Sequence, residues 1–278
     1  MSLRNAVRWS LFWIALSLAV SLGIGLFFTP EIGFQFGAGW LIEKALSIDN
    51  LFVFLMLFTY FKVEPEAQRK VLNYGILGVL VTRGVLIFLG IALVNQFEWI
   101  LYLLGAVVLY TGVMMLIRDD EAEFDGEKNH IVKFVRRLIP VHGEYHGVKF
   151  FIQENGKKIA TPLFVVLVVI ELTDVVFSFD SIPAVFSVSR DPWVVYGSNV
   201  LAVLGLRSLY FLLERMHKAF RFVEKAVGVV LLFVGAKMVL PVFSPKLEIS
   251  TIASLIVIFF VLTCGVLASI FIKEEATD

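Results

Sequence analysis

Charge and cysteine are both scarce in this chain of 278 residues. Charged residues make up 17% of it and hydrophobic residues 59%, whereas soluble domains contain about 25% and about 45–50%. This balance argues against a soluble globular enzyme. The single cysteine, Cys264, excludes an internal disulfide or a C-x-x-C redox pair, so the chain alone is no dithiol oxidoreductase. Lysine plus arginine balance aspartate plus glutamate at 24 each, so the net charge indicates neither nucleic acid nor an acidic substrate as a partner.

Long apolar runs are abundant instead, and they predict an all-α polytopic membrane protein. Each run is long enough to cross a hydrocarbon core of about 30 Å as a helix. Eight segments meet this test: 9–28, 37–61, 72–94, 97–117, 162–187, 193–213, 222–240 and 249–272. The first follows Arg4 and Arg8, but it is too long for a signal peptide and lacks a convincing cleavage site, so we expect an uncleaved span in the bilayer.

Basic residues are distributed unequally between the two sides of these spans. Nearly all the lysines and arginines outside the apolar runs fall on one side, and the opposite side has only Arg190 and Lys246. Because basic segments stay in the cytoplasm, both termini and the long connection 118–161 are predicted to be cytoplasmic.

The connection 118–161 contains two local patterns. Apolar residues at helical spacing alternate with basic ones over 131–139, which is typical of an ordinary amphipathic connector or of a helix on an anionic leaflet. Asn155-Gly156 separates two short apolar runs and predicts a hairpin. His142 and His146 stand four residues apart, but without a third ligand they do not favour a zinc site. The same connection could receive a cytosolic partner.

A pattern of polar residues on the second span recurs on the fifth. Glu43-x3-Ser47-x-Asp49-Asn50 is followed 131 residues later by Asp174-x3-Ser178-x-Asp180-Ser181. The next spans each contain one arginine, Arg83 and then Arg207. The third spans share two glycines seven residues apart, for which close helix packing is the better interpretation: Gly105 and Gly112, then Gly228 and Gly235.

These matches divide the chain into five parts. They are an N-terminal span (1–36), repeat A with three spans (37–117), the cytoplasmic connection (118–161), repeat B with three spans (162–240), and a last span with the C-terminal tail (241–278). Three is an odd number of crossings, so a cytoplasmic connection makes the second repeat enter the membrane upside down. Inverted 3+3 helix repeats are typical of secondary transporters, whose substrate site lies near the midplane.

Several charged side chains fall within or at the edges of the spans: Glu43, Lys44, Asp49, Arg83, Glu171, Asp174, Asp180, Arg207, Lys225 and Lys237. Each would cost roughly 2.5–3.5 kcal/mol at the centre of a lone helix, so they must face each other or water. Buried ion pairs that only hold the bundle together are one explanation of these charges. For the basic residues, this explanation is as good as a functional role. The five carboxylates on two related helices exceed what the orientation of two helices requires.

The acids have oxygen-bearing neighbours, which predicts a cation site between the repeats. At 100° per residue, one face of each helix forms a polar stripe: Glu43, Ser47 and Asn50, then Glu171, Asp174, Ser178 and Ser181. Asp49 and Asp180 lie about 120° from these stripes. Each therefore pairs with an arginine of the next span or lies where the helix unwinds, which Pro183 favours in the second copy.

The ligand types narrow the choice of cation. Carboxylate, hydroxyl and amide oxygens suit Mg²⁺, Mn²⁺ or Ca²⁺, and the lack of histidine in the spans disfavours copper and zinc. Protons and metal can compete for the same carboxylates, which is the physical basis of a proton-coupled antiporter. The sequence shows no nucleophile–base constellation that would indicate an enzyme.

The two polar helices resemble the signature of a known family. Residues 43–54, EKALSIDNLFVF, and 171–184, ELTDVVFSFDSIPA, are similar to the TerC family of bacterial integral membrane proteins, and more closely to its Alx-like branch. Supporting stretches include Asp191-Pro192, Ser198-Asn199 and residues 204–210, and the likeness covers roughly residues 37–240. It implies a manganese exporter of the bacterial cytoplasmic membrane, related to LysE-type transporters and first associated with tellurite resistance. Some members of the family are labelled redox modulators.

The resemblance also implies which residues bind metal, namely Glu43, Asp49, Glu171, Asp174 and Asp180. We expect Mn²⁺ export by proton antiport, with Asp49 and Asp180 as central ligands, no resident cofactor, and a shell completed by Ser47, Asn50, Ser178 and Ser181. Arg83 and Arg207 would balance the charge or lock one access state. The residues alone do not separate manganese from calcium, nor export from uptake, so another divalent-cation/proton antiporter is one alternative. A non-transporting membrane scaffold in metal or tellurite stress is the other.

Overall fold

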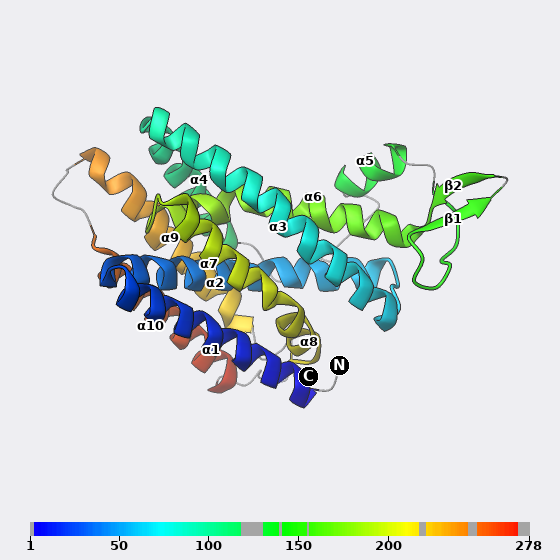
Figure 1. The fold of residues 1–278 in the computed structure, drawn as a ribbon, viewed down its shortest axis with the longest axis horizontal. Coiled ribbons are helices and arrows are strands. Elements are labelled where there is room, and N and C mark those ends of the chain that lie inside the picture. The colour runs from blue at the N-terminus through cyan, green and yellow to red at the C-terminus, as the bar shows by residue number, and fades with distance from the viewer. Residues whose placement is uncertain are drawn as a thin grey trace.

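A computed structural model of the chain describes residues 3–117, 130–138, 141–154, 156–216, 221–243 and 249–271. These residues form helices and one two-stranded hairpin (Figure 1). Repeat A follows α1 (Leu3–Phe27) and comprises α2 (Pro30–Tyr60), α3 (Pro65–Gln96) and α4 (Trp99–Ile117). The connection holds α5 (His130–Leu138), β1 (Phe151–Glu154) and β2 (Lys157–Ala160). Repeat B comprises α6 (Pro162–Phe186), α7 (Pro192–Leu204), α8 (Leu206–Met216) and α9 (Arg221–Phe243), followed by α10 (Thr251–Phe271).

The ends of the helices follow from local sequence. Proline occupies the first turn of α2, α3, α6 and α7, where a backbone N–H has no partner within the helix in any case. Thr29 caps α2 by accepting a hydrogen bond from the backbone N–H of Ile32. Asp191 caps α7 in the same way, accepting from the N–H groups of Trp193 and Val194. These caps allow very short connections between long helices.

Six of the described helices are long and apolar enough to cross a membrane, and the bent pair α7 and α8 makes a seventh if it counts as one span. The protein is therefore an all-α polytopic membrane protein. The remaining predicted span, 37–61, corresponds to α2, which is helical over 31 residues. Glu43, Lys44 and Asp49 interrupt its apolar run, so its composition alone does not identify it as a span.

α2 runs through the middle of the molecule, with α1 and α10 on one side and α3 and α6 on the other (Figure 1). Two hydrophobic clusters pack around it. One includes Leu51 and Phe58 of α2 and lies toward the hairpin, and the other includes Ile42 and surrounds the opposite half. Along α2, Glu43 lies among residues of the second cluster, and Ser47 and Asn50 lie between the two clusters. All three side chains are buried.

The glycine pairs of the third spans pack α4 against α9. A Cβ atom at Gly235 would lie 2.7 Å from the backbone nitrogen of Leu109, and one at Gly112 would lie 2.8 Å from that of Leu232. Gly105 faces the Gly235 carbonyl and Gly112 the Gly228 carbonyl, so the two helices run antiparallel. The packing interpretation of these glycines is confirmed, because any side chain would force the backbones apart.

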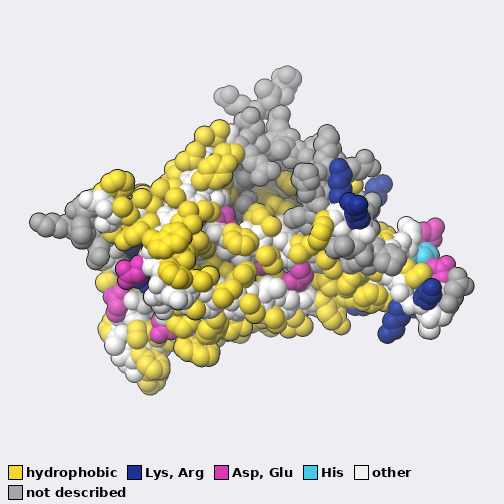
Figure 2. Space-filling view, turned by 90° about the horizontal axis from the view of Figure 1, so that it is seen from above, with side chains coloured by type: hydrophobic (Ala, Val, Ile, Leu, Met, Phe, Trp, Pro, Cys, Tyr) yellow, Lys and Arg dark blue, Asp and Glu magenta, His cyan; other side chains and the backbone are white. Residues whose placement is uncertain are grey.

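The connection forms the amphipathic helix and the hairpin that the sequence predicts. Val132 and Val135 of α5 are buried, whereas Lys133 and Arg137 are exposed. The strands pair antiparallel with Phe151 opposite Ala160, and Gly156 adopts a positive φ of 76° in the turn. Figure 2 shows Lys and Arg side chains gathered near this end of the molecule and hydrophobic side chains over its middle.

Candidate functional site

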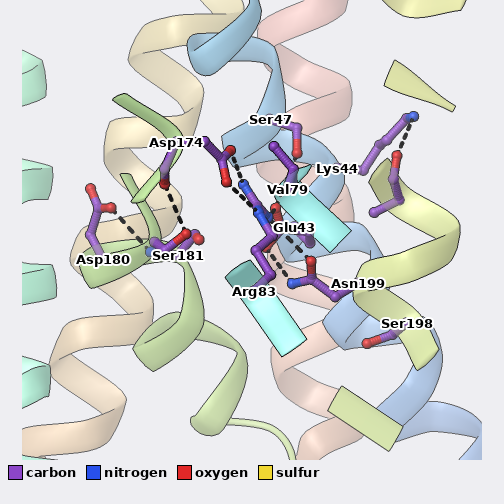
Figure 3. A network of polar contacts seen from close by, with 12 residues as sticks. Glu43, Lys44, Ser47, Val79, Arg83, Asp174, Asp180, Ser181, Ser198 and Asn199 are labelled. Atoms are coloured by element: carbon purple, nitrogen blue, oxygen red, sulfur yellow. Dashed lines mark hydrogen bonds and ion pairs between the residues drawn. The ribbon is translucent and has the colours of Figure 1, made fainter. Parts of the chain in front are cut away.

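Arg83 of α3 joins the two polar helices at the centre of the bundle. Its side chain is 1% exposed. Its Nη2 donates to Asp174 Oδ1 at 2.7 Å and its Nε to Asp174 Oδ2 at 3.0 Å, while its Nη1 donates to Glu43 Oε1 (Figure 3). Glu43 and Asp174 are themselves buried and occupy equivalent positions of the two repeated motifs. One guanidinium therefore pairs with two carboxylates that come from α2 and α6.

Two further side chains complete this network. Asn199 of α7 donates from Nδ2 to Glu43 Oε2 at 2.9 Å, and its Oδ1 accepts from Arg83 Nη1 at 3.2 Å. Ser47, one turn after Glu43 on α2, donates from Oγ to Glu43 Oε1 at 3.1 Å. Four helices thus contribute to one buried polar cluster, which we call the Arg83 network: Glu43, Ser47, Arg83, Asp174 and Asn199.

Asn199 is the member of the Arg83 network that motif spacing misses. It belongs to the Ser198-Asn199 stretch that is similar to the TerC family, but it has no counterpart among the repeated acids. Its amide at membrane depth was the one signal of a polar role. That signal is weak, because an uncharged amide changes the hydropathy little.

The remaining polar residues of α6 and α2 lie beside the Arg83 network. Ser178 donates its hydroxyl to the Asp174 carbonyl at 2.8 Å, a bond within its own helix. Ser181 Oγ and Asn50 Nδ2 are buried and have no hydrogen-bond partner among the described residues. A buried group of this kind leaves hydrogen-bonding capacity unused, which suits a ligand or water.

Asp180 is partly exposed, and its carboxylate accepts from the backbone N–H of Ser181 at 3.1 Å (Figure 3). It pairs with no arginine in the described part of the chain. The prediction that Pro183 unwinds the helix beside it is wrong, because α6 stays helical from Pro162 to Phe186. Pro183 lies in the last turn, where it removes only one helical hydrogen bond. Asp49 is helical in its backbone, but its side chain lies outside what the structure describes.

Glu171 does not join the Arg83 network. Both of its carboxylate oxygens are buried and lack a hydrogen-bond partner within the described ranges. The carboxylate lies against Gly78 of α3, where any side chain would collide with it. Gly78 therefore makes room for an acid that no cation among the described residues neutralises.

Arg207 lies away from the Arg83 network, in contrast to its predicted charge-balancing role. It is exposed and lines a different pocket with Trp9 and Trp13 of α1. The repeat places it at the position of Arg83, but the chain bends by 40° between α7 and α8, at Gly205. Lys44, another intramembrane cation, donates to the carbonyl of Ala202 at 3.1 Å.

The described residues do not form a metal site of protein ligands alone in this arrangement. No group of three or more acidic, histidine or cysteine side chains among the described residues is placed to hold an ion. Arg83 stands between Glu43 and Asp174 instead. A cation could reach these two carboxylates only if the guanidinium released at least one of them.

A cavity of about 610 Å³ opens at the end of the bundle opposite the hairpin. It lies between the first turns of α2 and the ends of α6 and α9, and its charged lining residues are Glu31, Arg190 and Lys237. Ser189 donates to Gln35 of α2 at 2.8 Å in its wall. Its lining residues Glu31 and Gln35 belong to α2, the helix that also holds Glu43.

The model of the integral membrane protein TerC family matches residues 28–277 of the chain. A protein from Photorhabdus laumondii named Alx, described as a candidate membrane-bound redox modulator, is 44% identical over 249 residues, which cover 86% of this chain and 77% of that protein. The Alx protein of Escherichia coli K12 is 41% identical over 248 residues, covering 86% and 77%. The thylakoid membrane protein TERC of Arabidopsis thaliana is 45% identical over 264 residues, covering 94% and 68%.

No solved structure matches the chain. The family match spans the polar helices, the connection and the bundle around them. The identities extend over most of the chain, well beyond the two motifs. The chain is therefore a member of the TerC family of integral membrane proteins.

Proposed function

We propose that this protein is a secondary transporter that exports Mn²⁺ from the cytoplasm in exchange for protons. The Arg83 network carries the proposal. It brings together Glu43 and Asp174, the equivalent acids of the two repeated motifs, and neutralises both with one buried arginine. Charge at membrane depth that exceeds the needs of assembly is a mark of an ion pathway.

Helix packing supports an inverted repeat around this site. α4 and α9 occupy the same place in the two repeats and run antiparallel, as two elements related by an axis in the membrane plane must. α2 packs on α7 while α3 packs on α6, so each first helix contacts the second element of the other repeat. A two-fold relation between the repeats would produce this crossed pattern of helix contacts.

Arg83 would act as a tethered competitor of the transported ion. A divalent cation and a guanidinium both bind carboxylate oxygens, so each can replace the other between Glu43 and Asp174. When Arg83 withdraws, Asp49 and Asp180 would supply the central ligands, with Glu43 and Asp174 beside them. Hydroxyl and amide oxygens of Ser47, Asn50, Ser178 and Ser181 would complete the shell.

In this mechanism, protons bind to the same carboxylates as the metal ion. A carboxylate must be deprotonated to bind a metal ion, so binding from one side and protonation from the other exclude each other. Glu171 lies three residues before Asp174 and has no protein partner among the described residues, which suits proton exchange. Coupling then requires that the site open to one side at a time, as rocking of the two repeats would allow.

The test is Mn²⁺ flux in proteoliposomes with an imposed pH gradient, with Ca²⁺, Mg²⁺ and Zn²⁺ as competitors. We expect proton-coupled Mn²⁺ flux that Asp180→Asn and Asp174→Asn abolish. Glu66→Gln is the matched control, because it removes an exposed carboxylate at the start of α3 and should leave flux unchanged. Full transport by both site variants would contradict the proposed site. A preference for Ca²⁺ over Mn²⁺ would contradict the proposed ion and identify Ca²⁺ as the substrate.

A scaffold that recruits a cytosolic partner is the second candidate, because the hairpin region is anchored firmly to the bundle. Tyr145 donates to the Phe61 carbonyl at 2.7 Å, and Lys70 donates to the Val148 carbonyl at 2.6 Å. Deletion of residues 149–158 separates the two functions. A transporter that still folds should keep its metal flux, whereas a scaffold should lose its partners without any change in flux.

A further inference from the structure

We infer that a pocket between α1, α3 and α8 binds the phosphate of an anionic phospholipid, with Arg207 as its main ligand. The pocket has a volume of about 420 Å³ and lies outside the Arg83 network. It is lined by two tryptophans of α1, by three residues of α3 and by residues on both sides of the break between α7 and α8: Trp9, Trp13, Asn73, Ile76, Leu77, Leu204, Arg207 and Ser208.

Arg207 is a cation without a counterion among the described residues. It is exposed on the surface of a membrane-spanning pair of helices and has neither a hydrogen bond nor an ion pair within the described part of the chain. Glu214, on the same helix, lies seven residues further on, or about 10 Å along the axis. An arginine at this depth needs an anion or water, and its planar guanidinium matches the geometry of a phosphate.

A second cation lies immediately behind the pocket. A Cβ atom at Gly205 would be 2.6 Å from Lys44 Nζ and 3.2 Å from Trp13 Cβ, so the ammonium group lies close to the pocket wall. Its hydrogen bond goes to the Ala202 carbonyl. The local field at the helix break is therefore positive and attracts an anion.

The depth and lining of the pocket favour a lipid over a soluble anion. At 1.5 Å per residue, Trp9, Asn73 and Arg207 lie roughly 9–14 Å from the hairpin-side ends of their helices. A long arginine side chain can reach a headgroup from this depth. Trp9 and Leu77 are 51% and 61% exposed on helices that face the bilayer. Tryptophan is enriched at the membrane–water interface, and apolar walls suit the first carbons of acyl chains.

The experiment is native mass spectrometry of the full chain in detergent, titrated with phosphatidylglycerol. We expect the wild-type chain to retain one lipid and Arg207→Gln to bind it about tenfold more weakly, the effect of losing one strong charge-assisted contact. Arg207→Lys should retain part of the affinity. Lys133→Gln, which removes an exposed cation of α5 on the same side, is the matched control and should bind as the wild type does.

A second variant keeps the test decisive if Arg207→Gln fails to fold. Asn73→Trp fills the pocket from an exposed position and should also weaken lipid binding while Arg207 remains. Inorganic phosphate at millimolar concentration should not displace the lipid. Equal phosphatidylglycerol binding by the wild type and both pocket variants would overturn the proposal, and so would displacement of the lipid by inorganic phosphate, which would make this a site for a soluble anion.

Discussion

At the residue scale, Arg83 sets the energetics of the polar centre. Arg83→Leu leaves Glu43 and Asp174 buried without their cation, which typically costs about 3–5 kcal/mol. We expect a lower free energy of unfolding in detergent titrations and a substantial recovery when Glu43→Gln and Asp174→Asn are added to Arg83→Leu. Equal stability of the single and triple variants would show that the acids do not depend on Arg83.

The same variant tests whether a metal ion can take the place of the guanidinium. If Arg83 competes with the transported cation, Mn²⁺ should raise the melting temperature of Arg83→Leu more than that of the wild type, because binding stabilises only the folded state. Mg²⁺ at the same concentration controls for nonspecific ionic effects. A smaller rise in the variant than in the wild type would mean that Arg83 assists binding and does not oppose it.

Asn199 contributes through two hydrogen bonds in the same network. Asn199→Ala removes the donor to Glu43 and should cost about 1–3 kcal/mol, because a buried carboxylate oxygen loses its partner. Ser198→Ala is a matched control on the preceding residue, since the Ser198 hydroxyl donates to the Val195 carbonyl of its own helix and to no other group that the structure describes. Thermal unfolding of both variants in one detergent compares them, and equal losses would contradict the assigned role.

Sequence patterns located the acids and Arg83 at this scale because charge inside an apolar run is a strong signal. They did not identify Asn199, because an uncharged amide hardly changes the mean hydropathy of its segment, and they misplaced Arg207. That arginine matches Arg83 in its sequence context, but it follows a break at Gly205 that turns it outward. Whether Asp49, Asp180 and the serines bind metal stays a prediction.

At the element scale, the contact between α4 and α9 depends on glycine. Gly235→Ala would place a Cβ atom 2.7 Å from the Leu109 backbone, so the helices must separate, and we expect a loss of about 1–3 kcal/mol. Gly23→Ala is the control, because nothing lies within 4 Å of a Cβ there and alanine favours the helix by up to about 1 kcal/mol. Unfolding titrations that rank the two variants equally would contradict the proposed contact.

The elements themselves were largely predictable because their signals are local. Runs of apolar residues gave the helices, Asn-Gly gave the hairpin, and the glycine spacing indicated the packing of α4 on α9. The effect of Pro183 was not predictable from its sequence alone. Its cost depends on how many turns follow it, and here α6 ends within one turn.

At the scale of the whole molecule, alternating access requires that the two repeats move relative to each other. Gln35 at the start of α2 and Ser189 after α6 meet in the wall of the cavity opposite the hairpin. In a Cys264→Ser background, Gln35→Cys with Ser189→Cys provides two thiols that a short, reducible methanethiosulfonate reagent can bridge. Bridging would hold the two repeats together at this end while the Arg83 network stays untouched.

We expect the bridge to stop Mn²⁺ flux in proteoliposomes and reduction to restore it, because a rocking transporter cannot change its access while its repeats are tied. Each single-cysteine variant treated with the same reagent controls for simple obstruction of the cavity. Cys264→Ser itself should transport normally, since this exposed thiol lies on α10, outside the repeats. Undiminished flux through the bridged protein would instead indicate a path that needs no relative motion, and the Arg83 network would then be a fixed filter in a channel.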